Sequence, residues 1–487
     1  MSAAPQRVLH VAAEIFPLLK TGGLADVVAA LPPALAVLGH DVRVLLPGLP
    51  AIRDGIGPLK RLAECGPAFG AGRVSLFSGR MPDTGLPVLL LDAPFLYDRP
   101  GNPYVDGSGL GWSDNHRRFA LLGWAAAQIG AGGLVEGWRP HIIHAHDWHA
   151  GLAAAYLAAR PGPRPATVFT IHNLAFQGLF DASVFAELGL PPAQFGIDGL
   201  EFHRQVSFMK AGLAYSDHIT TVSPTYAREI HDPAAAAGLE GLIRRRTASL
   251  SGILNGVDYA IWDPAHDPDI AQTYRSCPSP GKQACRAALR AEFGLAPNPG
   301  QALFCVVSRL SEQKGLDLVL AAVDRLIALD AQLVLLGSGD RALEEAFREA
   351  ALRHPAQIAV RIGYDERLAH RIIAGADVIL VPSRFEPCGL TQLYGLRYGT
   401  LPLVRRVGGL ADTVVDATAA ALADGSATGF AFETASPEAL ADTLQRAVAA
   451  WQQPKVWAGL CSSAMQASFS WDAAAARYHT LYLQLQT

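Results

Sequence analysis

The sequence has few charges and no excess of either sign. Of its 487 residues only 17% are charged, and 40 Lys and Arg against 44 Asp and Glu leave a formal net charge of -4. Proteins that bind nucleic acid need a basic surface, so nucleic acid is not an expected partner. Half of the residues are hydrophobic, which argues against disorder and predicts large buried cores. At this length two or more domains are expected.

Cysteine pairs and long apolar runs are also missing. None of the six cysteines stands in C-x-x-C spacing, so no zinc or dithiol motif is predicted. The most apolar stretch, residues 119–135, is short and contains several glycines, so we expect a buried helix rather than a membrane span. We find no signal-peptide pattern, and we expect a cytoplasmic protein with reduced thiols and no membrane partner.

The chain lacks G-x-G-x-x-G and Walker A patterns, which gives no support to a nicotinamide dehydrogenase or a P-loop kinase. It contains instead short apolar runs that alternate with helical spacing, as in residues 7–13, 24–38 and 41–47. Such continuous runs are typical of parallel strands buried on both faces. The alternation restarts near residue 302. We therefore predict an α/β protein with two Rossmann-like parallel-sheet domains that face a cleft, joined near residues 248–256.

Two glycine loops suggest anion binding at the carboxyl ends of the strands. The sequence GGLAD occurs at residues 22–26 and again at 408–412, each time between a predicted strand and a predicted helix. Lys20 adds a cation beside the first loop. Arg309 and Lys314 share another strand-to-helix loop, where they could hold a diphosphate. A chance repeat, a structural turn and solvated cations are the duller alternatives.

Three further motifs follow predicted strands. Residues 144–149, HAHDWH, could suggest a metal cluster, but no neighbouring cysteine or Glu-x-x-His pattern supports one. Sugar recognition is favoured, since carboxylate and imidazole bind hydroxyls and an indole covers a pyranose face. His172 is either a substrate contact or a satisfied core histidine. Glu386 precedes a helix over 390–398, so its carboxylate would stand beside N–H donors suited to phosphate.

Together these segments resemble the bacterial glycogen synthase and plant starch synthase family, whose fold is GT-B. The runs KTGGLADV and EPCGLTQLYGLRYGTLPLV carry the resemblance most specifically, and the matching segments are 20–27, 144–149, 172–178, 255–258, 308–315 and 382–414. The resemblance implies retaining transfer of glucose from ADP-glucose to the non-reducing 4-hydroxyl of an α-1,4-glucan such as glycogen, without a metal or organic cofactor. It also implies that 466–487 crosses back to a first domain of 1–250, leaving 251–465 as the nucleotide-sugar domain.

The family's roles then fall on particular positions. The catalytic groups would be Glu386, His172, Lys20, Arg309 and Lys314. The donor would be bound by Lys20, Gly23, Asn255, Arg309, Lys314, Glu386, Cys388, Gly389, Leu390 and Thr391, with Tyr364 stacked on adenine. The acceptor would meet Tyr104, Asp147 and Trp148.

The sequence departs from the family at two positions. Val407 stands where the family usually has Thr, and Phe176 replaces a common Tyr. Two other functions compete with the first. One is a transferase of the same fold that uses UDP-glucose or makes a disaccharide, and the other is a catalytically silent glucan-binding protein. For the retaining step we expect a front-face route, in which the leaving diphosphate helps the acceptor hydroxyl lose its proton.

Overall fold

The computed structural model describes residues 5–486 and divides into two compact units. One unit runs to Gly256 and includes the segment from Trp471 onward, and the other is Val257–Ser470. Each has its own hydrophobic core. Within the described residues, no helix combines the length and apolarity that a bilayer span requires.

The first unit is built on a nine-stranded sheet. Strands from β12 to β5 pair in parallel, and only β4 and β3 extend the sheet antiparallel. In sheet order the strands are β12 (Leu250–Gly252), β11 (His218–Thr221), β7 (Ala166–Ile171), β6 (Ile142–His146), β1 (Arg7–Val11), β2 (Asp41–Pro47), β5 (Pro87–Asp92), β4 (Ser75–Arg80) and β3 (Lys60–Glu64). A small antiparallel sheet contains β8 (Leu179–Asp181), β10 (Gln205–Ser207) and β9 (Glu201–Phe202).

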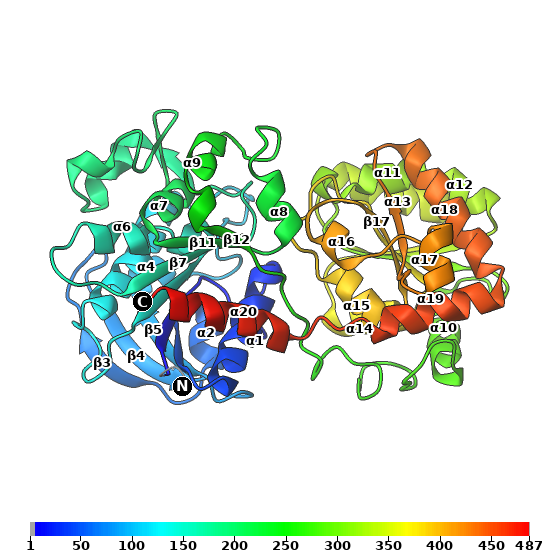
Figure 1. Ribbon diagram of the computed structural model, residues 1–487, viewed down its shortest axis with the longest axis horizontal. Helices are drawn as coiled ribbons and strands as arrows, with labels where there is room; N and C mark the ends of the chain where they lie inside the picture. The colour runs from blue at the N-terminus through cyan, green and yellow to red at the C-terminus, as the bar shows by residue number, and fades with distance from the viewer. Residues whose placement is uncertain (1–4, 487) are drawn as a thin grey trace. The chain divides into compact units, whose positions relative to one another are not determined.

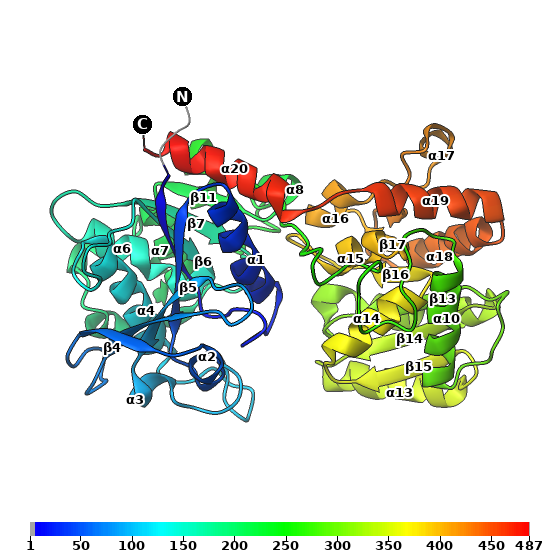
Figure 2. The same ribbon diagram turned by 90° about the horizontal axis from the view of Figure 1, so that it is seen from below.

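The C-terminal helix belongs to this first unit. Trp471, Tyr478 and Tyr482 of α20 share a buried cluster with residues of α1 and of the central strands. Figures 1 and 2 both show α20, in red, beside α1, in blue. The helices of the unit are α1 (Gly23–Val37), α2 (Pro50–Gly55), α3 (Pro94–Tyr97), α4 (Asn115–Gly130), α5 (Asp147–Ala150), α6 (Leu152–Ala158), α7 (Phe208–Tyr215), α8 (Pro224–Glu229), α9 (Glu240–Arg245) and α20 (Trp471–Gln484).

The second unit has an entirely parallel six-stranded sheet. Its order is β15 (Ile358–Ile362), β14 (Gln332–Gly337), β13 (Leu303–Val307), β16 (Val378–Val381), β17 (Leu401–Arg405) and β18 (Phe430–Phe432). The helices are α10 (Pro280–Phe293), α11 (Leu316–Ala321), α12 (Val323–Ala328), α13 (Arg341–Arg353), α14 (Glu366–Gly375), α15 (Thr391–Arg397), α16 (Gly408–Thr413), α17 (Ala419–Asp424), α18 (Pro437–Trp451) and α19 (Pro454–Gln466). Two parallel-sheet units confirm the predicted α/β class.

Strand order reverses once in each parallel sheet. From β1 the chain proceeds to β2 and β5 on one side, and it later places β6, β7, β11 and β12 on the other. In the second unit, β14 and β15 lie on one side of β13, and β16, β17 and β18 lie on the other. Open α/β sheets bind ligands beside such a reversal, beyond the carboxyl ends of the strands. The loops after β1, β6, β13 and β16 are therefore the ones to search.

Local signals set many helix ends. The side chain of Ser279 accepts the N–H of Lys282 and Pro280 follows it, which starts α10. Ser436 and Pro437 start α18 in the same way. α10 ends at Gly294, where φ is 67°, a conformation that glycine adopts without strain.

Gly315 and Gly294 form a natural pair for a stability test. Their φ values are 68° and 67°, but a Cβ on Gly315 would overlap the carbonyl oxygen of Pro382, whereas one on Gly294 would meet nothing within 4 Å. We expect Gly294→Ala to lose about 1–2 kcal/mol from left-handed strain alone. Gly315→Ala should lose more, because the loops after β13 and β16 must separate. Calorimetry should give Gly315→Ala the lower melting temperature, and equal losses would contradict this packing.

Candidate active site

Two opposite charges meet where the second sheet reverses. Lys314 lies on the loop after β13 and Glu386 on the loop after β16, and Lys314 Nζ is 2.5 Å from Glu386 Oε2. Ser383 Oγ donates to the same oxygen at 2.9 Å. Glu386 is only 5% exposed. A buried carboxylate without partners would lower the stability of the fold. The contact with Lys314 avoids this cost, and it links the loop after β13 to the loop after β16.

The glycine pair of the second unit packs against the Glu386 loop. A Cβ on Gly408 would overlap the carbonyl oxygen of Glu386, and a Cβ on Gly409 would overlap that of Cys388. The N–H of Gly409 donates to the carbonyl of Glu386 at 3.1 Å. We predicted phosphate donors here, but this N–H already has a backbone partner. The main role of Gly408 and Gly409 is therefore to let their loop pack closely against the Glu386 loop.

The turn after Glu386 is stabilised from the first turn of α15. Gly389 has a φ of 74°, and Gln392 Nε2 donates to the carbonyls of Cys388 and Gly389, each at 3.0 Å. Cys388 is buried, whereas Leu390 and Thr391 are half-buried. The predicted donor residues 388–391 thus form one ordered turn that leads from the sheet edge into a helix.

Two exposed side chains lie at the same edge of this sheet. Arg309 follows β13, and within the described chain its guanidinium has no hydrogen-bond or ion-pair partner. Tyr364 follows β15 and is 66% exposed, with its hydroxyl donating to Glu366. A guanidinium can bind the phosphates of a nucleotide, and an exposed aromatic ring can stack on its base.

In the first unit an internal carboxylate occupies the glycine loop. Glu14 accepts the backbone N–H of Thr21 at 2.5 Å and the Thr21 hydroxyl at 2.6 Å, and the Tyr104 hydroxyl also donates to it. Glu14 is 2% exposed, and burial raises its pKa despite these bonds. Lys20 Nζ lies 3.0 Å from Asp26 Oδ1, while Gly23 begins α1.

Asp147 joins the loops after β6 and β7. Its Oδ1 accepts the backbone N–H groups of His172 at 2.8 Å and of Asn173 at 3.4 Å. It is 6% exposed, and burial raises the pKa of this carboxyl to about 7. Trp148, the next residue, is half-buried, and a Cβ on Gly178 would overlap its indole ring. These contacts place a carboxyl group and an indole between two strand ends.

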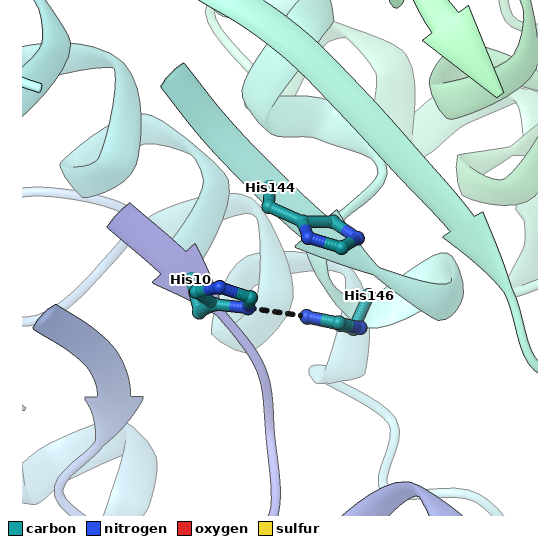
Figure 3. A group of neighbouring side chains, drawn as sticks. All are labelled: His10, His144 and His146. Carbon is teal, nitrogen blue, oxygen red and sulfur yellow. Dashed lines mark hydrogen bonds between the residues drawn. The ribbon is translucent and has the colours of Figure 1, made fainter. Parts of the chain in front are cut away.

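Hydrogen bonds link the imidazole rings of His172, His146 and His10 in a row. His172 Nε2 is 3.0 Å from His146 Nδ1, and His146 Nε2 is 2.9 Å from His10 Nδ1. Figure 3 shows His10 and His146 joined in this way, with His144 beside them. Burial lowers the pKa of His10 and of His172 to about 3, and that of His146 well below its usual range.

Two groups in the described residues have the spacing of metal ligands. His10, His144 and His146 are buried with one nitrogen each within 4.8 Å, but every ring nitrogen except His10 Nε2 already has a hydrogen-bond partner. Asp267, Asp269 and His370 form the second group, in which Asp267 accepts a bond from His370 at 2.7 Å. Most ligand atoms of the first group and the Asp267–His370 pair of the second are thus already occupied by hydrogen bonds within the protein.

The predicted residues fall into two sets, one in each unit. The first unit holds Lys20, Gly23, Tyr104, Asp147, Trp148 and His172 near the ends of β1, β6 and β7. It also holds the buried Asn255, one residue before its first segment ends at Gly256. The second unit holds Arg309, Lys314, Tyr364, Glu386, Cys388, Gly389, Leu390 and Thr391.

Glu14 and His10 contribute to the first set but were not singled out in the sequence, and His146 was named only as part of the HAHDWH motif, without a role of its own. The alternation of His144 and His146 on a strand could have indicated that both point to one face.

Comparison with known proteins covers nearly the whole chain. The family described as "Starch synthase catalytic domain" matches residues 7–245, and "Glycosyl transferases group 1" matches residues 290–458. The chain is 56% identical over 481 residues to a protein named glycogen synthase from Serratia proteamaculans, covering 98% of this chain and 100% of that one. It is 54% identical over 484 residues to a glycogen synthase from Francisella philomiragia, with the same coverage.

Solved structures agree with these matches. The catalytic domain of starch synthase IV from Arabidopsis thaliana, solved with ADP and acarbose, superposes with a TM-score of 0.90 at 31% identity and 99% coverage of both chains. A sucrose-phosphate synthase from Thermosynechococcus elongatus superposes with a TM-score of 0.60 at 20% identity and the same coverage, which shows a shared fold.

The raised pKa of Asp147 predicts a pH-dependent stability. Its carboxyl binds a proton more readily in the folded than in the unfolded protein, so its contribution is fully present below about pH 4 and is lost as the pH rises through about 7. Asp147→Asn keeps an acceptor for the His172 N–H but cannot ionise. Relative to this variant, the wild type should lose at most about 4 kcal/mol of unfolding free energy between pH 4 and pH 8. Parallel stability curves for the two proteins in denaturant would contradict the assignment.

Proposed function

The chain belongs to the glycogen and starch synthase family of GT-B glycosyltransferases, and we propose that it transfers glucose from ADP-glucose to the non-reducing end of an α-1,4-glucan with retention. The observation that carries this proposal is the full-length identity of 56% to a glycogen synthase. A nucleotide-sugar donor and a glucan acceptor follow from the family, and adenine as the base is the finer part of the proposal. We also place the enzyme in the cytoplasm, in keeping with its free cysteines.

In this proposal the second unit binds the donor. Arg309 and Lys314 hold the diphosphate, the first through a bidentate guanidinium and the second as a compact charge. Tyr364 stacks on the base, and this role is supported by the 66% exposure of the residue. Residues 388–391 surround the phosphate and the sugar. Val407 lacks the hydroxyl of the Thr that the family usually has before Gly408. Binding of the diphosphate then depends more on Arg309 and Lys314.

Glu386 holds the donor glucose and favours the positive charge that grows at its anomeric carbon. The buried pair with Lys314 supports this role, because it holds the carboxylate beside a cation and largely away from solvent. When the diphosphate arrives, Lys314 gains a second anion to bind. The carboxylate then faces the sugar with less of its charge neutralised, and its stabilisation is greatest in the transition state.

The first unit supplies the remaining contacts in this proposal. Lys20 and Gly23 approach the donor, His172 meets the reacting glucose, and Asn255 lines the same region. Tyr104, Asp147 and Trp148 bind the acceptor, whose contact with Phe176 lacks the hydroxyl usual in the family.

The proposed step needs no metal or organic cofactor. The bond from the anomeric carbon to the diphosphate oxygen breaks, and the acceptor 4-oxygen forms the new bond on the same face. The acceptor's proton passes to the leaving diphosphate, so ADP departs with the charge balanced.

The role of Glu386 can be separated from its packing. Glu386→Gln keeps the shape and removes the charge, so kcat should fall by about 10²–10³-fold while donor affinity changes little. Glu312→Gln makes the same change on the exposed side chain of the neighbouring loop and should leave kcat unaltered. Steady-state kinetics below the melting temperature decide the matter. A Glu386→Gln enzyme that melts earlier but turns over normally would reduce Glu386 to a structural residue.

The donor preference is tested by turnover of ADP-glucose and UDP-glucose with one α-1,4-oligosaccharide acceptor. We expect kcat/KM to favour ADP-glucose by at least about tenfold, the equivalent of one well-placed hydrogen bond. The product should be one α-1,4-linked glucose longer. A preference for UDP-glucose, or binding of the glucan without any transfer, would overturn the proposal.

A further inference from the structure

His10, His146 and His172 form a head-to-tail chain of imidazoles. Nδ1 of His10 faces Nε2 of His146 at 2.9 Å, and Nδ1 of His146 faces Nε2 of His172 at 3.0 Å. The rings come from β1, from β6 and from the residue after β7, which are adjacent strands of one sheet. Figure 3 shows the first of these bonds. Three neighbouring strands thus present one continuous line of ring nitrogens.

Each hydrogen bond of this imidazole chain contains one proton. His10 and His146 are fully buried, so each ring is neutral and carries a single N–H. Because each bond joins an Nδ1 to an Nε2, a proton on Nδ1 of one ring requires the next ring to use its Nδ1 as well. All three rings therefore share one tautomer, and the tautomer of His172 depends on that of His10 two rings away.

The buried end of the chain decides which tautomer this is. Nε2 of His10 is buried without a hydrogen-bond partner in the described protein. A buried N–H without an acceptor is rarer in proteins than a buried acceptor without a donor. His10 therefore carries its proton on Nδ1 and donates it to His146, which donates in turn to His172.

We propose that His146, itself fixed by His10, is a positioning residue that holds His172 in its Nδ1–H form and so presents this N–H at the sheet edge to a hydroxyl of a sugar substrate. The inference rests on the proposed function only for the identity of the sugar. His172 Nδ1 is the other end of the imidazole chain. Among the described residues it has no hydrogen-bond partner, and His172 is half-buried at the sheet edge. The backbone N–H of His172 is held by Asp147, so ring and backbone are fixed from two sides.

His144 provides a matched control inside the same cluster. It is as buried as His10 and His146, and its ring lies 4.7 Å from that of His10 and 4.3 Å from that of His146. Its nitrogens bond elsewhere, to the Tyr482 hydroxyl at 2.7 Å and to Thr170 Oγ1 at 2.5 Å. Removing His144 disturbs the packing of the chain but breaks none of its hydrogen bonds.

Nitrogen NMR of the full-length protein labelled at histidine tests the proposal without any substrate. In the wild type, His172 should show one neutral tautomer, protonated on Nδ1. In His146→Leu it should lose this preference, because the ring that donates to His172 Nε2 is gone, whereas His144→Leu should keep it and only lower the melting temperature. Wild-type His172 protonated on Nε2, or a His172 signal that is the same in His146→Leu, would overturn the proposal.

Kinetics add a readout that a purely structural role would not move. His146→Leu should lower kcat for glucose transfer about tenfold, the effect of one hydrogen bond, with KM for ADP-glucose changed less than about twofold. His146→Asn, whose amide can donate to His172 from the position of Nδ1, should restore most of kcat. An unchanged kcat in His146→Leu would refute the positioning role. If the wild type transfers no glucose at all, the proposed function fails, and the NMR result still decides the tautomer.

Discussion

Parallel strands bring all their carboxyl ends to one edge of a sheet, and a reversal of strand order separates two neighbouring loops at that edge. Both units of this protein depend on that constraint. In the first unit, the loops after β1 and β6 bring Glu14 near Asp147. In the second, the loops after β13 and β16 bring Lys314 to Glu386. The charged groups are scattered in the sequence, and the sheets alone make them neighbours.

Each of these buried carboxylates is held by donors suited to phosphates or sugars. Backbone N–H groups and hydroxyls hold Glu14 and Asp147, while an ammonium and a hydroxyl hold Glu386. In the proposed function, these donors are already oriented by the fold, so little reorganisation is required when substrate binds. The same arrangement explains why glycine is needed at Gly408 and Gly409, where two loops touch through their backbones.

Much of the fold could be predicted from periodicity. The run 41–47 is a strand with the predicted bounds, because most of its side chains are apolar and buried within the parallel sheet. The antiparallel edge of β3 and β4 was not predicted, since β3 is largely exposed and lacks an apolar run. In the site, Glu386 and Lys314 stood out by their motifs, but their contact spans 72 residues and is a product of packing. The imidazole chain was missed because His10 and His146 are 136 residues apart and no short-range pattern links them. Glu14 was missed although its partner Thr21 is only seven residues away, because a lone carboxylate at that spacing belongs to no motif.

The central claim is that the second unit binds the donor's diphosphate beside the Lys314–Glu386 pair. A crystal structure of the protein with ADP tests it most directly. The account predicts the diphosphate within hydrogen-bonding distance of Arg309 and Lys314, with the base against Tyr364. A diphosphate bound away from the loops after β13 and β16 would contradict it.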